Sequence, residues 1–167
     1  MKRFRPLEWV LAVFALLVVA AICFPVFAYD GIRAPDSTCL WNVKQSSLGL
    51  VMYAADENDR LPLRDRWMDA TLPYVKQEGI WHCPLVPKGV YGYAYNGVLS
   101  GTKQTLFDAP GSVPMVYDSV NPIRNASDLC ASLPLPGRHG RKEGGGSNTV
   151  GFVDGHAKSV PARAVAR

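Results

Sequence analysis

Two histidines and an aspartate near the end of this chain are residues whose types could bind a metal ion. His139, Asp154 and His156 offer two imidazoles and a carboxylate, which are ligands that divalent metals accept. A turn aspartate and a strand histidine also have structural explanations that need no metal. We therefore expect no cofactor, with a divalent metal held by these three residues as the alternative.

Cysteines offer a second kind of chemistry. Three of the four cysteines, Cys39, Cys83 and Cys130, follow the apolar N-terminal segment. None has the short Cys-x-x-Cys spacing typical of a zinc site or a redox centre. In an oxidising compartment two of the three would pair, and the sequence alone does not choose which two. We expect one structural disulfide, with Cys39–Cys83 as the first choice.

The chain has no arrangement of residues that indicates catalysis. We find no nucleophile with a neighbouring base and no paired carboxylates. The glycines at 144–146 precede a predicted strand, whereas a phosphate cradle needs a following helix. The sequence therefore predicts a protein that is not an enzyme, and a metal-dependent enzyme is the least favoured alternative.

The N-terminal segment determines where these groups can lie. Three cations occur in the first five residues, Glu8 follows, and residues 9–28 carry no charge. Twenty helical residues span about 30 Å, the thickness of the hydrocarbon core of a bilayer. We expect residues 1–28 to be a transmembrane anchor with a cytoplasmic N-terminus, because the cations precede the span. A cleaved signal peptide ending at Ala28 is the alternative.

The rest of the chain has the size of one domain. Gly31 and Pro35 indicate a linker at 29–36, and we expect 37–167 to form an exported head. The net charge is +4, and no basic stripe is interleaved with aromatic residues. That pattern argues against a nucleic-acid partner.

Hydrophobic periodicity predicts an α+β head, with an amphipathic helix packed on a small antiparallel sheet. Asn96-Gly97 and Asp154-Gly155 are favoured hairpin turns. The expected elements are helices at 37–57 and 65–74, and strands at 90–95, 113–117, 149–153 and 156–160. Tyr91, Tyr93 and Tyr95 would share one face of the first strand. Such a stripe is either a packed face or a surface for a sugar or a peptide.

Several segments, in order, resemble those of the bacterial type IV pilin-like proteins and the type II secretion pseudopilins. The likeness is to the group that combines a prepilin-type N-terminus with a C-terminal His…Asp-Gly motif. The matching segments are Phe24-Pro25-Val26-Phe27-Ala28, Cys39-Leu40-Trp41-Asn42-Val43-Lys44-Gln45, Met52-Tyr53-Ala54-Ala55-Asp56, Leu72-Pro73-Tyr74-Val75-Lys76, Cys83-Pro84, Arg138-His139, and Asn148 with Phe152-Val153-Asp154-Gly155-His156. Together they cover nearly the whole chain.

The resemblance implies roles for residues of the N-terminal segment. Glu8 matches the carboxylate that pairs with a neighbouring subunit's N-terminal amine, and Pro25 matches a marked position of the same helix. Arg3 stands where the family has its processing glycine, and Phe4 matches the residue that follows. The resemblance thus places any processing between Arg3 and Phe4.

The resemblance implies a non-enzymatic subunit of a type II secretion or type IV pilus-like assembly. Its partners would be copies of itself or related pseudopilins, together with the inner membrane. Such a protein would be single-pass in the bacterial inner membrane, or incorporated in a filament. A secreted or anchored binding module that uses the tyrosine stripe or the Gly-rich loop is the second hypothesis.

Overall fold

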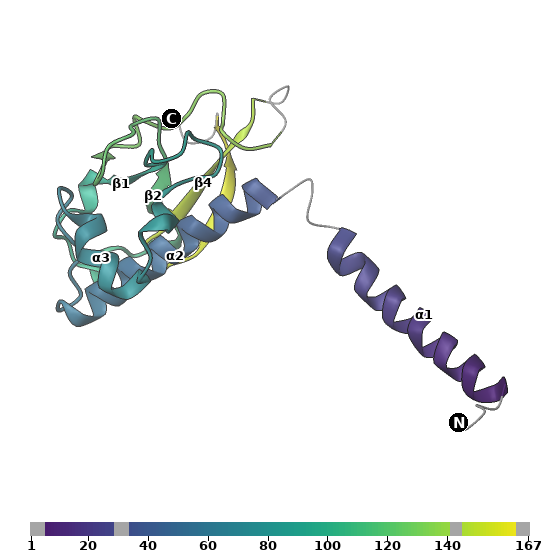
Figure 1. Cartoon of the computed structure of the whole chain (residues 1–167). Helices are drawn as coiled ribbons and strands as arrows, with labels where there is room; N and C mark the ends of the chain where they lie inside the picture. Colours follow the sequence, from purple (N-terminus) through teal and green to yellow (C-terminus); the bar gives the residue numbers. More distant parts are fainter. Residues whose placement is uncertain (1–5, 29–33, 141–144, 163–167) are drawn as a thin grey trace. The chain divides into compact units, whose positions relative to one another are not determined.

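The structure is a computed structural model that describes residues 6–28, 34–140 and 145–162. The chain divides into two compact units, Met1–Ala34 and Pro35–Arg167. Figure 1 shows the helix of the first unit and the helices and sheet of the second. We describe each unit by itself.

Helix α1 (Pro6–Ala28) forms the first unit. Its described large apolar side chains are between 41% exposed, at Val18, and 69% exposed, at Leu16. Pro25 lies inside α1, and the helix ends three residues later at Ala28. Arg3 and Phe4, the residues of the expected processing position, lie outside the described residues.

The expectation of a transmembrane anchor needs correction. Among the residues that the structure describes, no helix is long and apolar enough to cross a membrane. The prediction of a transmembrane helix at 1–28 is therefore wrong, and so is the single-pass inner-membrane location with an exported head.

Helix α2 (Ala34–Asp56) begins the second unit, slightly before the predicted start at residue 37. Cys39, Val43, Leu50 and Ala54 are fully buried along one face of this helix. Their separations of four, seven and four residues keep them on one side of a helix with 3.6 residues per turn. The predicted amphipathic helix is thus present.

A mixed five-stranded sheet lies against α2 in the described part of the head (Figure 1). Its strands are β1 (Tyr93–Asn96), β2 (Pro114–Asp118), β3 (Ser127–Asp128), β4 (Ser147–Phe152) and β5 (Ala157–Pro161). The spatial order is β3-β1-β2-β4-β5. The β1–β2, β2–β4 and β4–β5 pairs are antiparallel, and the short β1–β3 pair is parallel.

Direct contact between α2 and the sheet gives the head its α+β class. Gly151 of β4 lies so close to α2 that an added Cβ would collide with Ser47 and Val43. The same apolar core includes Leu50 of α2 and Met115 of β2. The predicted α+β head is therefore present, but its sheet is mixed rather than antiparallel, because β3 pairs with β1 in parallel.

The two predicted hairpin turns have different outcomes. Asp154 and Gly155 do connect β4 to β5, and Gly155 has a φ of 85°, which glycine adopts without strain. By contrast, Asn96 leads into the short 3₁₀ helix Gly97–Leu99, and its side-chain oxygen accepts the N–H of Val98. The strand that pairs antiparallel with β1 begins only at Pro114. The prediction of a hairpin at Asn96-Gly97 is therefore wrong.

Two of the three tyrosines of the predicted stripe belong to the core, and Tyr91 is only partly buried. Tyr93 and Tyr95 are fully buried, and Tyr95 stacks on Trp67 with ring centroids 5.8 Å apart. Trp67 lies in helix α3 (Trp67–Val75), and its ring meets Trp81 edge-on at 6.0 Å. Burial raises the pKa of both tyrosines well above its usual value. Tyr93 and Tyr95 therefore offer no surface to a sugar or a peptide.

Candidate functional site

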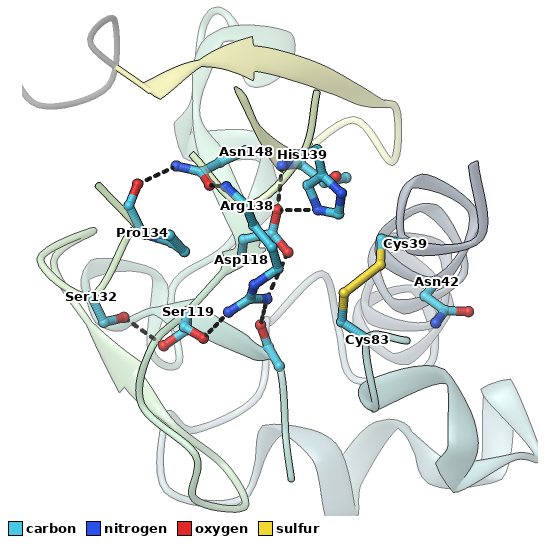
Figure 2. Close-up of polar contacts among 12 residues, drawn as sticks. Cys39, Asn42, Cys83, Asp118, Ser119, Ser132, Pro134, Arg138, His139 and Asn148 are labelled. Carbon is cyan, nitrogen blue, oxygen red and sulfur yellow. Dashed lines mark hydrogen bonds and ion pairs between the residues drawn. A yellow bond between two sulfur atoms is a disulfide. The ribbon is translucent and has the colours of Figure 1, made fainter. Parts of the chain in front are cut away.

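A buried carboxylate at the end of β2 is the centre of the most connected polar cluster of the head (Figure 2). Asp118 is 0% exposed. Its Oδ1 accepts a hydrogen bond from Arg138 Nη1 at 2.9 Å, and its Oδ2 accepts the backbone N–H of Thr149 at 2.6 Å. A buried charge is costly unless it is paired and hydrogen-bonded, and Asp118 has both kinds of contact.

Arg138 supplies the countercharge. Its side chain is 9% exposed, and besides Asp118 it donates to two backbone carbonyls. Nη1 reaches Gly92 O at 2.7 Å, and Nη2 reaches Ser119 O at 2.5 Å. The backbone N–H of Arg138 donates to Asn148 Oδ1 at 3.0 Å. One guanidinium thus joins the segment before β1, the end of β2 and the segment that leads to β4.

His139 lies next to Arg138 and is 4% exposed. Its Nε2 is 2.8 Å from Asp118 Oδ2, and its Nδ1 is 3.0 Å from Asp36 Oδ1. Burial opposes a charge on the ring, but the two carboxylates outweigh burial and raise the pKa of His139 above its usual value. The backbone of His139 also exchanges two hydrogen bonds with Ser147 at the start of β4.

A disulfide lies beside the imidazole (Figure 2). Cys39 of α2 is bonded to Cys83, with the two Cα atoms 5.5 Å apart, and this is the pair that we preferred from the sequence. Asp36 and Cys39 are three residues apart on α2, so they share one face of the helix. One ligand atom from each of Cys39, Cys83 and His139 falls within 4.8 Å of the others. These three residues form a group that could hold a metal, although the two cysteines are joined to each other.

The chemistry of this cluster is limited by burial. Asp118 and His139 are enclosed, whereas the side chain of Asp36 is 47% exposed. Their contacts link α2, β2 and the segment before β4 through charges that compensate one another. In the metal-free, oxidised state the arrangement is best suited to holding the head together.

Asp154 and His156 meet in a different place, at the turn between β4 and β5. Asp154 Oδ1 lies 2.5 Å from His156 Nδ1 and accepts the backbone N–H of His156 at 3.0 Å. The imidazole also stacks on Phe152, with ring centroids 4.4 Å apart. Slight burial raises the pKa of Asp154, but the bonds from His156 outweigh it and lower the pKa below its usual value.

The structure does not unite the three metal ligands predicted from the sequence. His139 pairs with Ser147 at the start of β4, whereas Asp154 follows the other end of that strand at Phe152. Five strand steps of about 3.3 Å separate the two ends by roughly 17 Å. A single ion needs ligand bonds of about 2 Å, so His139 and the Asp154–His156 pair cannot share one.

The remaining residues singled out from the sequence belong to other parts of the chain. Cys130 is a free, half-buried cysteine, and burial raises the pKa of its thiol. Its backbone N–H donates to Tyr117 Oη at 3.1 Å. Glu8 and Pro25 are in α1, in the other compact unit.

Asp118 and Asp36 are the site residues that the sequence reasoning missed. Asp118 directly follows the apolar residues of β2, and all of Met115, Val116 and Tyr117 are buried. A carboxylate at the end of such a strand needs a cationic partner. That requirement, together with the neighbouring residues Arg138 and His139, is the sequence signal that could have predicted their contact with Asp118.

Comparison with known proteins adds no relative to this picture. No family model, no curated protein and no solved structure matches the chain. The function must therefore be argued from the helices, the sheet and the buried cluster themselves.

Proposed function

We propose that the chain is a non-enzymatic, pilin-like structural subunit of a type II secretion or type IV pilus-like assembly. Its partners are copies of itself or related pseudopilins. The observation that carries this proposal is the combination of an apolar helix in a unit of its own with a head in which the long helix α2 packs on a sheet. The ordered sequence likeness to the pilin-like proteins supports the same function.

The exposed side chains of α1 favour assembly. Leu11, Leu16 and Leu17 are each about 60% exposed or more, and with 3.6 residues per turn they lie on different sides of the helix. A helix that is apolar all round is normally buried, and a large exposed apolar patch normally marks an interaction site. The α1 helix of another copy has the same apolar surface and is always present in equal amount, so it can bury these side chains.

The head suits a subunit that must keep its shape. The Cys39–Cys83 disulfide and the pairing of Asp118 with Arg138 join α2 to the sheet and to the segments around it. Because these groups are buried, they are better placed to stabilise the head than to meet a substrate. In the proposal α1 provides the assembly contact and the head provides the exposed, rigid body.

The proposal assigns Glu8 to a charged contact between neighbouring α1 helices. The sequence likeness gives Glu8 this role, with an N-terminal amine as its partner. Pro25 marks the last turns of the same helix. Processing between Arg3 and Phe4 would create the amine at the position where the family has it.

Cross-linking through Cys23 tests the proposal. Full-length protein with Cys130→Ser is oxidised mildly and analysed on non-reducing gels, and the same samples are sedimented over a range of concentrations. We expect Cys23-linked dimers and a concentration-dependent oligomer, with assembly weakened about tenfold, or ~1.4 kcal/mol, by Glu8→Ala.

Glu57→Ala is the matched control, because Glu57 is an exposed carboxylate just beyond α2. This variant should assemble like the parent protein. A chain that sediments as a monomer at every concentration would contradict the proposal. If Glu8→Ala and Glu57→Ala change assembly equally, Glu8 does not take part in the contact.

A further inference from the structure

We propose that the Cys39–Cys83 disulfide opens reversibly and that its two thiolates, together with His139, then bind one Zn²⁺ ion. The three residues are 0%, 2% and 4% exposed, and they lie side by side (Figure 2). Thiolate and imidazole are the ligands that zinc prefers. The inference is independent of the assembly proposed above.

The positions of the ligand atoms suit a zinc ion. They lie within 4.8 Å of one another. In a tetrahedral site, bonds of about 2.3 Å to sulfur and 2.1 Å to nitrogen place the ligand atoms roughly 3.5–3.8 Å apart. A small inward movement is therefore enough once the bond between the sulfurs is open. Water would supply the fourth ligand, as it does in zinc sites with three protein ligands.

His139 is already oriented as a metal ligand would be. Its Nδ1 lies 3.0 Å from Asp36 Oδ1, and metal-binding histidines commonly use one ring nitrogen for such a carboxylate. Its Nε2 is buried and makes no well-aligned hydrogen bond, although Asp118 Oδ2 is 2.8 Å away. A buried polar atom without an aligned partner is rare, and a metal ion bound at Nε2 would give this nitrogen one.

The opening step needs a dithiol as the reductant. The dithiol gives two electrons and two protons, the bond between the Cys39 and Cys83 sulfurs breaks, and the reductant closes its own disulfide. Zinc then binds the two sulfurs as thiolates, and their protons pass to water. Cys39 lies in the second turn of α2, and helix ends are the parts of a helix that open most readily.

Zinc titration of the full-length chain tests the inference. The background is Cys23→Ser with Cys130→Ser, so that only Cys39 and Cys83 can contribute sulfur. The protein is reduced with a trialkylphosphine without oxygen and titrated with Zn²⁺ against a coloured chelator, and circular dichroism reports the fold. Co²⁺ serves as the spectroscopic probe of thiolate ligation.

We expect the reduced protein to bind one zinc per chain, and the oxidised protein to bind at least about 100-fold more weakly. His139→Gln should weaken binding to a similar extent, and Asp36→Asn by roughly 10–100-fold. His156→Gln is the matched control, because that histidine is at the β4–β5 turn, and it should change nothing.

Equal zinc affinity of the reduced and oxidised proteins would overturn the inference. Equal affinity of the His139→Gln and His156→Gln proteins would also overturn it. If reduction unfolds the head, added zinc must restore the circular dichroism signal. A reduced chain that stays unfolded in zinc would count against the site as well.

Discussion

Asp118 carries its charge into the interior of the head, and three neighbours make this tolerable. Arg138 donates to one oxygen, Thr149 donates to the other, and His139 lies beside it. Removing one partner of a buried ion pair leaves the other charge uncompensated, at a cost of about 3–5 kcal/mol. The cluster therefore makes the fold depend on single side chains.

Arg138→Met should lower the free energy of unfolding by about 3–5 kcal/mol. The substitution keeps an apolar stem in place but removes the donor to Asp118 and the donors to the carbonyls of Gly92 and Ser119. Urea unfolding followed by circular dichroism measures the change.

The same substitution at Arg66 is the control. Arg66 is 65% exposed, and its ion pair with Asp65 is 3.8 Å long. Arg66→Met should change stability by no more than about 0.5 kcal/mol. If the two variants lose similar free energy of unfolding, the buried Asp118–Arg138 pair contributes no more to stability than the exposed pair.

At the scale of elements, α3 is fastened to the segment between β2 and β3. Arg124 donates to Asp69 Oδ1 through Nε at 2.9 Å and through Nη2 at 2.7 Å, and Asn125 Nδ2 donates to the other oxygen at 2.5 Å. Asn125 Oδ1 in turn accepts the N–H of Met68 at 2.8 Å. One exposed carboxylate thus joins a helix to a connection that is 55 residues further along the chain.

The contribution of Asp69 should depend on pH in a defined direction. Hydrogen bonds from Asn125 and Arg124 lower the pKa of Asp69 in the folded state below its ordinary 3.8. Its stabilisation is therefore present above that value and is lost as the pH falls through the folded pKa. Between about pH 5 and 7, Asp69→Asn should cost up to ~1 kcal/mol, because solvent screens this half-exposed pair.

Urea unfolding at several pH values checks this prediction. The difference between the parent protein and Asp69→Asn should shrink below about pH 4. Asp65→Asn, at an exposed carboxylate with a long ion pair, should show a difference near zero throughout. If the stability difference between the parent protein and Asp69→Asn grew on acidification, the direction assigned to the pKa shift of Asp69 would be wrong.

Local patterns predicted the elements whose signals lie within one segment. The helical periodicity of α2 and the Asp154-Gly155 turn between β4 and β5 are of this kind. β3 escaped prediction because its two residues are defined by a distant contact, in which Tyr95 donates its N–H to Ala126 O. The Asn96-Gly97 signal failed because Asn96 caps a 3₁₀ turn instead.

In the candidate site, as in the fold, the sequence predicted individual residues better than their distant partners. Cys39–Cys83 was the preferred pair, and His139 was recognised as a candidate ligand. The partners of His139 were not predicted, because Asp36 is 103 residues away in the sequence and Asp118 lies at the end of β2. Burial and a partner brought in by the fold, rather than a motif, decide what this histidine does.

At the scale of the whole molecule, the Cys39–Cys83 bond joins α2 to the segment before β1 across 44 residues. Closing a loop of this length removes entropy from the unfolded chain and is worth about 4 kcal/mol in the chain-entropy model. The bond is therefore one of the larger single contributions to the stability of the head.

Reduction in the presence of a chelator should lower the free energy of unfolding by about 2–4 kcal/mol. Urea unfolding of the reduced and oxidised protein measures the difference, with alkylation to confirm the state of each cysteine. Cys130→Ser should leave the result unchanged, since Cys130 is free in the structure. An unchanged unfolding midpoint after full reduction would contradict the prediction.

The strand order has a consequence for the time at which the head can form during synthesis. β4 lies between β2 and β5, yet along the chain it follows β2 only after β3, at Ser147–Phe152. A ribosome-bound chain that has just released α2, α3, β1 and β2 still lacks the strand that pairs with β2 and the residue that neutralises Asp118. Because domains fold as units, such a nascent chain must wait, with its apolar faces uncovered, until β4 has been released. A premature stop ahead of β4 would therefore remove the whole head rather than trim it.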